Sequence, residues 1–212
     1  MIKAVIFDID GVLLDSYEAN FRFYCSLLEA AGYKGPTQKE FPNYFHMSMY
    51  DGIKAMTGLE DEDEVKRIWE MGRGKDNVVS YPVELLAMPD GCEKVMKKLA
   101  GKYKLGIVTS RIRESTYEGP MAKLRDLFDA SVSYQDTENH KPHPEPLHLA
   151  AKKLGLKPEE CVYIGDMPSD IKAANAARMK IILYSKDYIE GANAETADFK
   201  ELPKLIEEVS QK

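Results

Sequence analysis

The sequence predicts an α/β fold, a doubly wound parallel sheet with an all-helical domain inserted into it. Short apolar runs such as Val5-Ile6-Phe7 lack polar alternation, which is typical of strands buried on both faces of a parallel sheet. From residue 90 onward such runs alternate with segments of helical periodicity, as in α/β proteins. Between residues 16 and 86 only helical, aromatic-rich segments occur. We therefore expect a core domain of residues 1–15 and 87–212 and an inserted helical domain of residues 16–86.

The elements of the core follow from apolar patterns and helix boundary signals. Asp90-Gly91-Cys92-Glu93 has the spacing of a capping box, with Asp90 as the N-cap of a helix. Asp15 and Ser16 can likewise cap a helix that ends at Gly32. The expected strands are 5–7, 105–108, 130–133, 161–164 and 180–183, and the later expected helices are 114–126, 146–154, 169–177 and 202–209.

Composition and apolar patterning argue against nucleic-acid and membrane partners. The chain has 212 residues, a net charge of −6 and both signs of charge interspersed, so no basic block favours a nucleic acid. The three cysteines are widely spaced without a CxxC pair, which is typical of reduced thiols in a cytoplasmic protein. No apolar run approaches the length of a membrane span or forms a signal peptide. No apolar stripe indicates an oligomeric state.

Polar side chains follow three of the expected strands at the point where each strand ends. They are Asp8 and Asp10, Thr109 and Ser110, and Asp166. Burying an unpaired charge is costly, so two aspartates after a buried strand are expected to serve a site. Since parallel strands bring their carboxyl ends to one edge of a sheet, where ligands bind in open α/β folds, these groups should lie close together.

Two further groups complete the expected site. Asp170 lies four residues after Asp166, near the start of a helix, and Lys141 lies in a loop stiffened by three prolines. Four carboxylates so close would repel one another, and all-oxygen ligands suit a hard cation such as Mg²⁺. Lys141 and the metal together can neutralise a phosphate dianion, while Thr109 donates hydrogen bonds to its oxygens. The arrangement indicates phosphoryl transfer on a small phosphorylated metabolite.

These motifs together resemble the haloacid dehalogenase superfamily. The resemblance rests on Asp8-Ile9-Asp10-Gly11-Val12, Thr109-Ser110, Lys141-Pro142 and Gly165-Asp166-Met167-Pro168-Ser169-Asp170, in the family's order and spacing. It implies a Rossmann-like core, and the place of the helical insertion resembles the phosphoglycolate-phosphatase-like branch, in which such an insertion is a cap. Arg111 after Thr109-Ser110 departs from the family's pattern.

The resemblance also implies a role for each residue. Asp8 would attack phosphorus and form an aspartyl-phosphate, and Asp10 would protonate the leaving oxygen and then activate water. Mg²⁺ would be held by Asp8, Asp166 and the backbone carbonyl of Asp10. Asp170 would orient Lys141 or a metal-bound water. Thr109, Ser110 and Lys141 would hold the transferring phosphoryl group.

Other functions are weighed against the phosphatase. A phosphosugar mutase would use the same core with a cap that excludes water. A dehalogenase needs no acid two residues after its nucleophile, so Asp10 argues against it. A non-catalytic binding or regulatory protein would be free to lose motif residues, and none is missing here. Taken singly, Thr109, Lys141 and Asp170 also suit an ordinary strand end, a solvated loop and a helix N-terminus.

The sequence also suggests which residues select the substrate. The segment 44–52 mixes aromatic and hydrogen-bonding side chains between two helical pieces, so His46 is expected to contact the substrate. Arg111 follows the phosphate-holding pair, and its guanidinium could reach a second anionic group. Ordinary surface positions are the alternative interpretation for both.

Overall fold

The computed structural model describes residues 1–45, 47–73 and 78–211. Contacts divide the chain into two compact units, Met1–Asp15 with Ala87–Lys212, and Ser16–Leu86. These residue numbers coincide with the boundaries expected from sequence, and the role of the insertion as a cap stays a prediction. The chain enters and leaves the insertion through an antiparallel bridge between Asp15 and Ala87.

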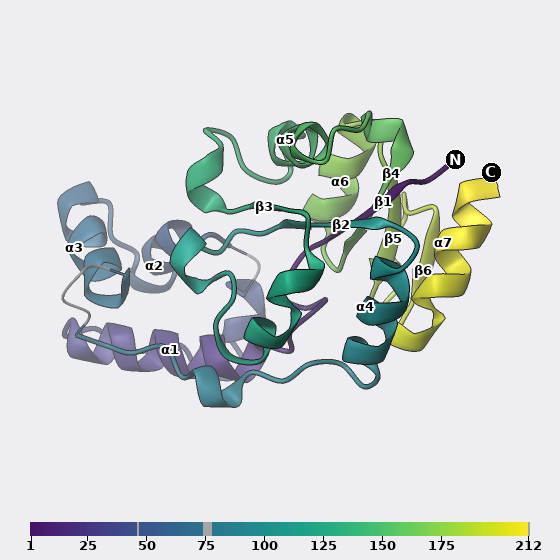
Figure 1. Ribbon diagram of the computed structural model, residues 1–212. Helices are drawn as coiled ribbons and strands as arrows, with labels where there is room; N and C mark the ends of the chain where they lie inside the picture. Colours follow the sequence, from purple (N-terminus) through teal and green to yellow (C-terminus); the bar gives the residue numbers. More distant parts are fainter. Residues whose placement is uncertain (46, 74–77, 212) are drawn as a thin grey trace. The chain divides into compact units, whose positions relative to one another are not determined.

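The core is built on one sheet of parallel strands, which confirms the expected fold class. β1 lies in the middle, between β2 and β4, with β3 beyond β2 and β5 beyond β4 (Figure 1). Ala4 pairs with Lys104 on one side and with Cys161 on the other, so β1, β2 and β4 end at nearly the same level. The strands are β1 (Ala4–Phe7), β2 (Lys104–Val108), β3 (Ala130–Val132), β4 (Cys161–Gly165), β5 (Lys180–Tyr184) and β6 (Ala194–Thr196).

Helices cover both faces of this sheet, which explains the unbroken apolar runs of the central strands. All four residues of β1 are buried, and so are all five of β4. Ala4 and Ile6 face a cluster that includes the apolar sides of α5 (Glu145–Lys153) and α6 (Pro168–Ala176). On the other face, Phe7 stacks against Phe199, and α4 (Cys92–Ala100) and α7 (Leu202–Gln211) contact the sheet (Figure 1).

The inserted unit has a separate aromatic core. It contains α1 (Tyr17–Ala30), α2 (Met49–Thr57) and α3 (Glu62–Arg73), with short 3₁₀ turns at Phe41–Asn43 and Val83–Leu85. Phe41 is fully buried and packs against the rings of four other aromatic residues. Among the described residues of this unit, all regular structure is helical.

Three local predictions were wrong, and one short strand was not predicted. The expected helix 114–126 is replaced by 3₁₀ turns at Arg113–Ser115 and Gly119–Leu127, because Gly119-Pro120 interrupts it. Asp90 does not cap α4, since its carboxylate pairs with Lys200 and Gly91 occupies the N-cap position at φ +76°. The edge strand β6 was not expected, and α2 already includes the last residues of segment 44–52.

Within the described residues, no helix combines the length and the apolar character needed to cross a bilayer.

Candidate active site

The loop after β1 carries the first two aspartates. The Asp8 amide continues the strand ladder by donating to the carbonyl of Ile164 on β4 at 2.9 Å. Asp8 Oδ1 accepts from the amide of Ile9 at 2.7 Å, which fixes the direction of the carboxylate. Gly11 then turns the chain at φ +78°, a conformation that favours glycine. A Cβ atom on Gly11 would lie 2.0 Å from Asp166 Oδ2, so the turn also gives Asp166 its space.

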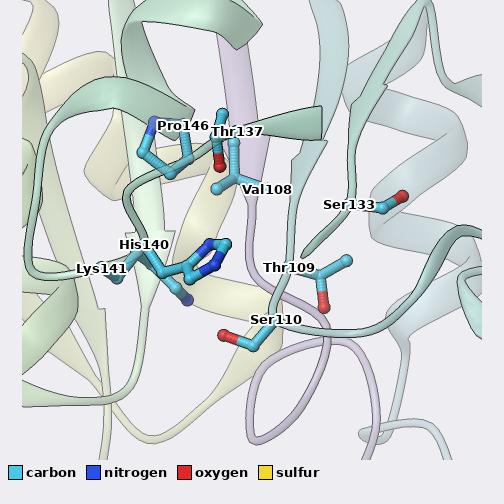
Figure 2. Close-up of a pocket in the computed structure, with 8 residues that line it drawn as sticks. All are labelled: Val108, Thr109, Ser110, Ser133, Thr137, His140, Lys141 and Pro146. Carbon is cyan, nitrogen blue, oxygen red and sulfur yellow. The ribbon is translucent and has the colours of Figure 1, made fainter. Parts of the chain in front are cut away.

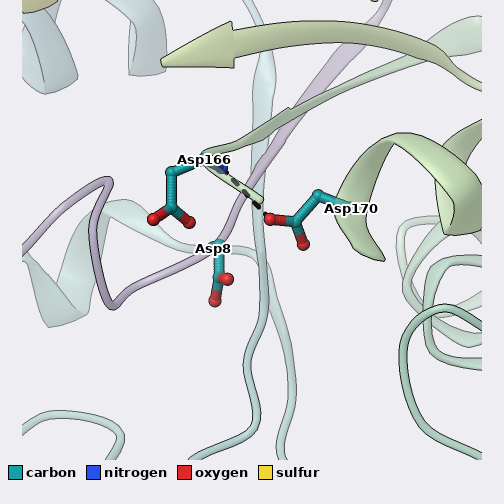
Figure 3. A group of neighbouring side chains, drawn as sticks. All are labelled: Asp8, Asp166 and Asp170. Carbon is teal, nitrogen blue, oxygen red and sulfur yellow. Dashed lines mark hydrogen bonds between the residues drawn. The ribbon is translucent and has the colours of Figure 1, made fainter. Parts of the chain in front are cut away.

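Three carboxylates converge at this edge of the sheet. Asp8 follows β1, Asp166 follows β4, and Asp170 belongs to the first turn of α6 (Figure 3). One oxygen atom from each lies within 4.8 Å of the others. The register of β1 with β4 explains the first two, and the amides of Asp166 and Met167 hold the third by donating to Asp170 Oδ2. The convergence expected from the strand ends is therefore found for these side chains.

Lys141 is the cation that the protein places among these carboxylates. Its ammonium lies 2.5 Å from Asp8 Oδ2 and 2.8 Å from Asp170 Oδ1, and its side chain is 8% exposed. It also donates to the hydroxyl of Tyr163 at 3.1 Å, and that hydroxyl donates to Asp170 Oδ1 at 3.0 Å. Asp170 Oδ2 accepts from the amides of Asp166 and Met167. Each oxygen of Asp170 thus has two donors, which makes this carboxylate an anchor for Lys141.

Burial and mutual repulsion dominate the electrostatics of the cluster. Burial raises the pKa of Asp8 to about 7, with Asp170 adding to the shift and Lys141 opposing it. Burial likewise raises the pKa of Asp166 to about 8, and Asp8 and Asp170 add to that shift. Burial lowers the pKa of Lys141, but Asp170 and Asp8 outweigh it and hold that pKa well above its ordinary value. One ammonium does not balance three carboxylates here.

These residues fit a divalent cation. With all three carboxylates ionised, Lys141 leaves an excess of two negative charges. Asp166 Oδ1 is buried and has no hydrogen-bond partner among the described residues. A buried carboxylate oxygen without a donor is costly, and a hard cation removes that cost. Asp166 offers lone pairs for such an ion, and so does Asp8, whose oxygens have one donor each, while each oxygen of Asp170 already has two donors.

The loop after β2 lies beside this cluster. Thr109 is buried, and its Oγ1 accepts from the amide of Arg111 at 3.1 Å, while Ser110 is exposed. Thr109, Ser110 and Lys141 line a cavity of about 10 Å³, close to the space that one water molecule needs. His140 lines it too, and Figure 2 shows its ring among these side chains. The other lining residues are Val108, Ser133, Thr137 and Pro146.

Arg111 takes a position that its sequence context did not indicate. Its Nε and Nη2 donate to Asp10 Oδ2 and Oδ1 at 2.8 and 2.7 Å, a bidentate pair between the loops after β2 and β1. The arginine side chain is only 7% exposed, whereas that of Asp10 is 30% exposed. The expected contact of Arg111 with a second anionic group of the substrate stays a prediction.

Sequence reasoning missed one polar member of the cluster. Tyr163 was counted as part of an apolar strand, yet its hydroxyl joins Lys141 to Asp170. The available signal was its position between Val162 and Ile164 in a fully buried strand, because a buried tyrosine hydroxyl requires a hydrogen-bond partner. His46, the substrate contact expected from the insertion, lies outside the described residues.

Comparison with known proteins adds independent information about the chain. Residues 5–184 match the family model described as haloacid dehalogenase-like hydrolase. The chain is 30% identical to pyrophosphatase PpaX of Bacillus pumilus over 182 residues. This aligned region covers 84% of this chain and 81% of that protein. PpaX of Bacillus cereus strain AH820 is 29% identical with the same coverage.

Solved structures of similar chains agree with the family-model match. A haloacid dehalogenase superfamily hydrolase of subfamily IA from Geobacter sulfurreducens is 25% identical, with a TM-score of 0.74 over 97% of this chain and 100% of that one. CbbY from Rhodobacter sphaeroides, solved with phosphate, is 19% identical, with a TM-score of 0.75 over 95% and 96%, and shows the same fold. The expectation of a hydrolytic enzyme is confirmed. The chain belongs to the haloacid dehalogenase-like hydrolases.

Proposed function

We propose that this protein is a Mg²⁺-dependent phosphatase that hydrolyses a small phosphorylated metabolite through an aspartyl-phosphate on Asp8. The observation that carries the proposal is the buried Asp8 carboxylate, held by Ile9 and Lys141 at the carboxyl end of the central strand. A carboxylate fixed in this way is pre-oriented for attack on an incoming phosphorus atom.

Each neighbouring group has a part in the two chemical steps. In the first, Asp8 Oδ forms a bond to phosphorus while the bond to the leaving oxygen breaks, and Asp10 gives that oxygen a proton. In the second, Asp10 takes a proton from water as the water oxygen bonds to phosphorus and the bond to Asp8 breaks. Thr109, Ser110 and Lys141 hold the phosphoryl oxygens during both steps, and Asp170 and Tyr163 hold Lys141.

The metal is proposed on the donor set of the cluster. Asp8, Asp166 and the backbone carbonyl of Asp10 would hold Mg²⁺, and Asp166 Oδ1, which has no donor within the described part of the chain, supports this assignment. When bound, the ion supplies positive charge against the phosphate oxygens and offsets the repulsion among the carboxylates. Asp170, whose oxygens are engaged by donors, acts by orienting Lys141.

The substrate class is drawn from chemistry and from relatives. The core groups recognise a phosphoryl group and no further part of the molecule, so selection of the metabolite is assigned to the insertion, including His46. Phosphoglycolate-like esters and sugar phosphates are candidates, and the likeness to PpaX adds inorganic pyrophosphate. A protein from Thermotoga maritima assigned as beta-phosphoglucomutase is 27% identical, with a TM-score of 0.71, which keeps a phosphosugar mutase as the second candidate.

Phosphate release from a panel of these compounds tests the proposal. We expect turnover with Mg²⁺, loss of turnover in EDTA and recovery when Mg²⁺ is returned. Asp8→Asn should reduce turnover to the background rate, because it removes the attacking oxygen. Activity that survives chelation, or an active Asp8→Asn variant, would contradict the mechanism.

The mutase candidate differs in its product. A hexose 1-phosphate would yield the 6-phosphate with little free phosphate if the enzyme were a mutase, and free hexose with stoichiometric phosphate if it were a phosphatase. Product analysis by NMR distinguishes the two.

A further inference from the structure

We propose that Arg111 is a positioning residue that holds Asp10 for the second half of the reaction, the hydrolysis of the aspartyl-phosphate. This inference rests on the proposed function, because it assigns Arg111 a part in that two-step reaction. It differs from the expectation that Arg111 binds a second anionic group of the substrate.

The contact geometry is the first argument. Arg111 meets Asp10 through two parallel N–H donors at 2.7 and 2.8 Å, one to each carboxylate oxygen. Such a fork fixes both the place and the plane of a carboxylate, which a single ammonium contact does not. Asp10 lies on the turn that follows Asp8, and its partner is 101 residues away in sequence, so the pair joins the loops after β1 and β2.

Arg111 is itself fixed at both ends. Its backbone amide donates to Thr109 Oγ1, and its backbone carbonyl accepts from the amide of Tyr134 at 2.8 Å. At the far end of the side chain, Nη1 lies 3.5 Å from the carbonyl oxygen of Ser115. An arginine that is 7% exposed and anchored in this way can orient its partner.

The form of Asp10 that Arg111 grips determines the step. Donors to both oxygens pair with the carboxylate, which is the form that accepts a proton from water. Asp10 reaches this form when it has given its proton to the leaving oxygen. Arg111 then holds the carboxylate toward the position of the attacking water until the proton of that water is transferred and the bond between Asp8 and phosphorus breaks.

The steps can be separated by kinetics with 4-nitrophenyl phosphate. For this good leaving group, kcat reports hydrolysis of the aspartyl-phosphate, whereas kcat/KM reports its formation. We expect Arg111→Gln to lower kcat about 10- to 100-fold, a part of the usual general-base contribution. KM should fall in parallel, so that kcat/KM stays within about threefold of wild type. Acid-quenched samples should contain more aspartyl-phosphate than wild type.

Three matched variants sharpen this experiment. Arg111→Lys keeps the charge without the fork, so its kcat should lie between those of wild type and Arg111→Gln. Arg113→Gln removes a neighbouring arginine that pairs with Asp136 on the surface, and it should leave both kinetic constants unchanged. In an Asp10→Asn background, adding Arg111→Gln should lower kcat no further, because the effect passes through Asp10.

Several results would overturn the inference. An unchanged kcat, a loss confined to kcat/KM, or a rise in KM limited to substrates with a second anionic group would each show that Arg111 does not serve hydrolysis. Additive losses in the double variant would do the same. If wild type forms no aspartyl-phosphate with any ester, the proposed function fails as well, so the two failures are distinguishable.

Discussion

Replacement of Gly11 by alanine separates backbone strain from damage to the metal site. Gly11 has φ +78°, and a Cβ atom there would lie 2.0 Å from Asp166 Oδ2. Gly155 is a matched control in the same unit, with φ +70° and no atom of the described residues within 4 Å of its Cβ position. A side chain in this left-handed region costs about 1–2 kcal/mol, so Gly155→Ala should lower Tm by roughly 2–8 °C.

Gly11→Ala carries that strain and an additional displacement. Ordinary contact needs about 3.5 Å, so the Asp166 carboxylate must retreat by roughly 1.5 Å. A shift of that size at a reacting centre costs about 10²-fold in rate. We therefore expect Gly11→Ala to lose about 10²-fold in kcat and to need at least about tenfold more Mg²⁺ for half-maximal activity, whereas Gly155→Ala keeps both values.

Thermal unfolding and Mg²⁺ titration of 4-nitrophenyl phosphate turnover measure the two effects. Manganese binding followed by electron paramagnetic resonance gives a readout that does not depend on turnover. If Gly11→Ala matches Gly155→Ala in turnover and metal affinity, the space beside Gly11 does not position Asp166 and the reasoning is wrong.

Three further predictions concern single contacts. Tyr163→Phe removes the hydroxyl between Lys141 and Asp170. It should lower the free energy of unfolding, measured in urea, by about 1 kcal/mol and lower kcat severalfold. Lys141→Met leaves Asp8 and Asp170 without their ammonium, so in EDTA it should lower the free energy of unfolding by about 3–5 kcal/mol, and equal unfolding midpoints would contradict this. With Mg²⁺ present, the same variant should raise KM. Burial alone would raise the pKa of Asp136. The amide of Ser133 and the side chain of Arg113 donate to its ionised form, and together they hold that pKa below its usual value. Asp136→Asn should therefore destabilise the protein at pH 7. Urea midpoints should show this difference shrinking below about pH 4, where the unfolded chain binds a proton first and folded Asp136 follows at lower pH.

The central part of the fold could be predicted because its strands are buried on both faces. Val5-Ile6-Phe7 is an unbroken apolar run, and the polar residues where it stops mark the functional edge. The edge strand β6 has only three residues, Ala194–Thr196, and Glu195 among them is exposed, so it leaves no such signal. Gly119-Pro120 indicated that no α-helix forms over residues 114–126. The helical spacing of the apolar residues on either side of that break favoured a helix and led to the wrong prediction.

The candidate site also contains residues whose placement could be predicted from sequence and residues whose placement could not. Asp8 and Asp166 could be placed together because parallel strands bring their ends to one edge of the sheet. The pair of Arg111 with Asp10 could not, since no spacing rule links residues 101 positions apart in two irregular loops. Tyr163 was missed for a different reason: strand burial predicts that a tyrosine is inside, but not where its hydroxyl is directed.

The bridge between Asp15 and Ala87 has a consequence for how this architecture can be altered. The Asp15 amide donates to the carbonyl of Ala87 at 2.8 Å, and the Ala87 amide donates back at 3.3 Å. These two hydrogen bonds join the residues that flank the insertion, as the last residue pair of a β-hairpin joins the two ends of its loop. Because closure entropy grows only slowly with loop length, the segment between these residues can be lengthened, shortened or exchanged at small cost to the core. A segment from a relative joined at Asp15 and Ala87 should therefore leave the stability of the core nearly unchanged.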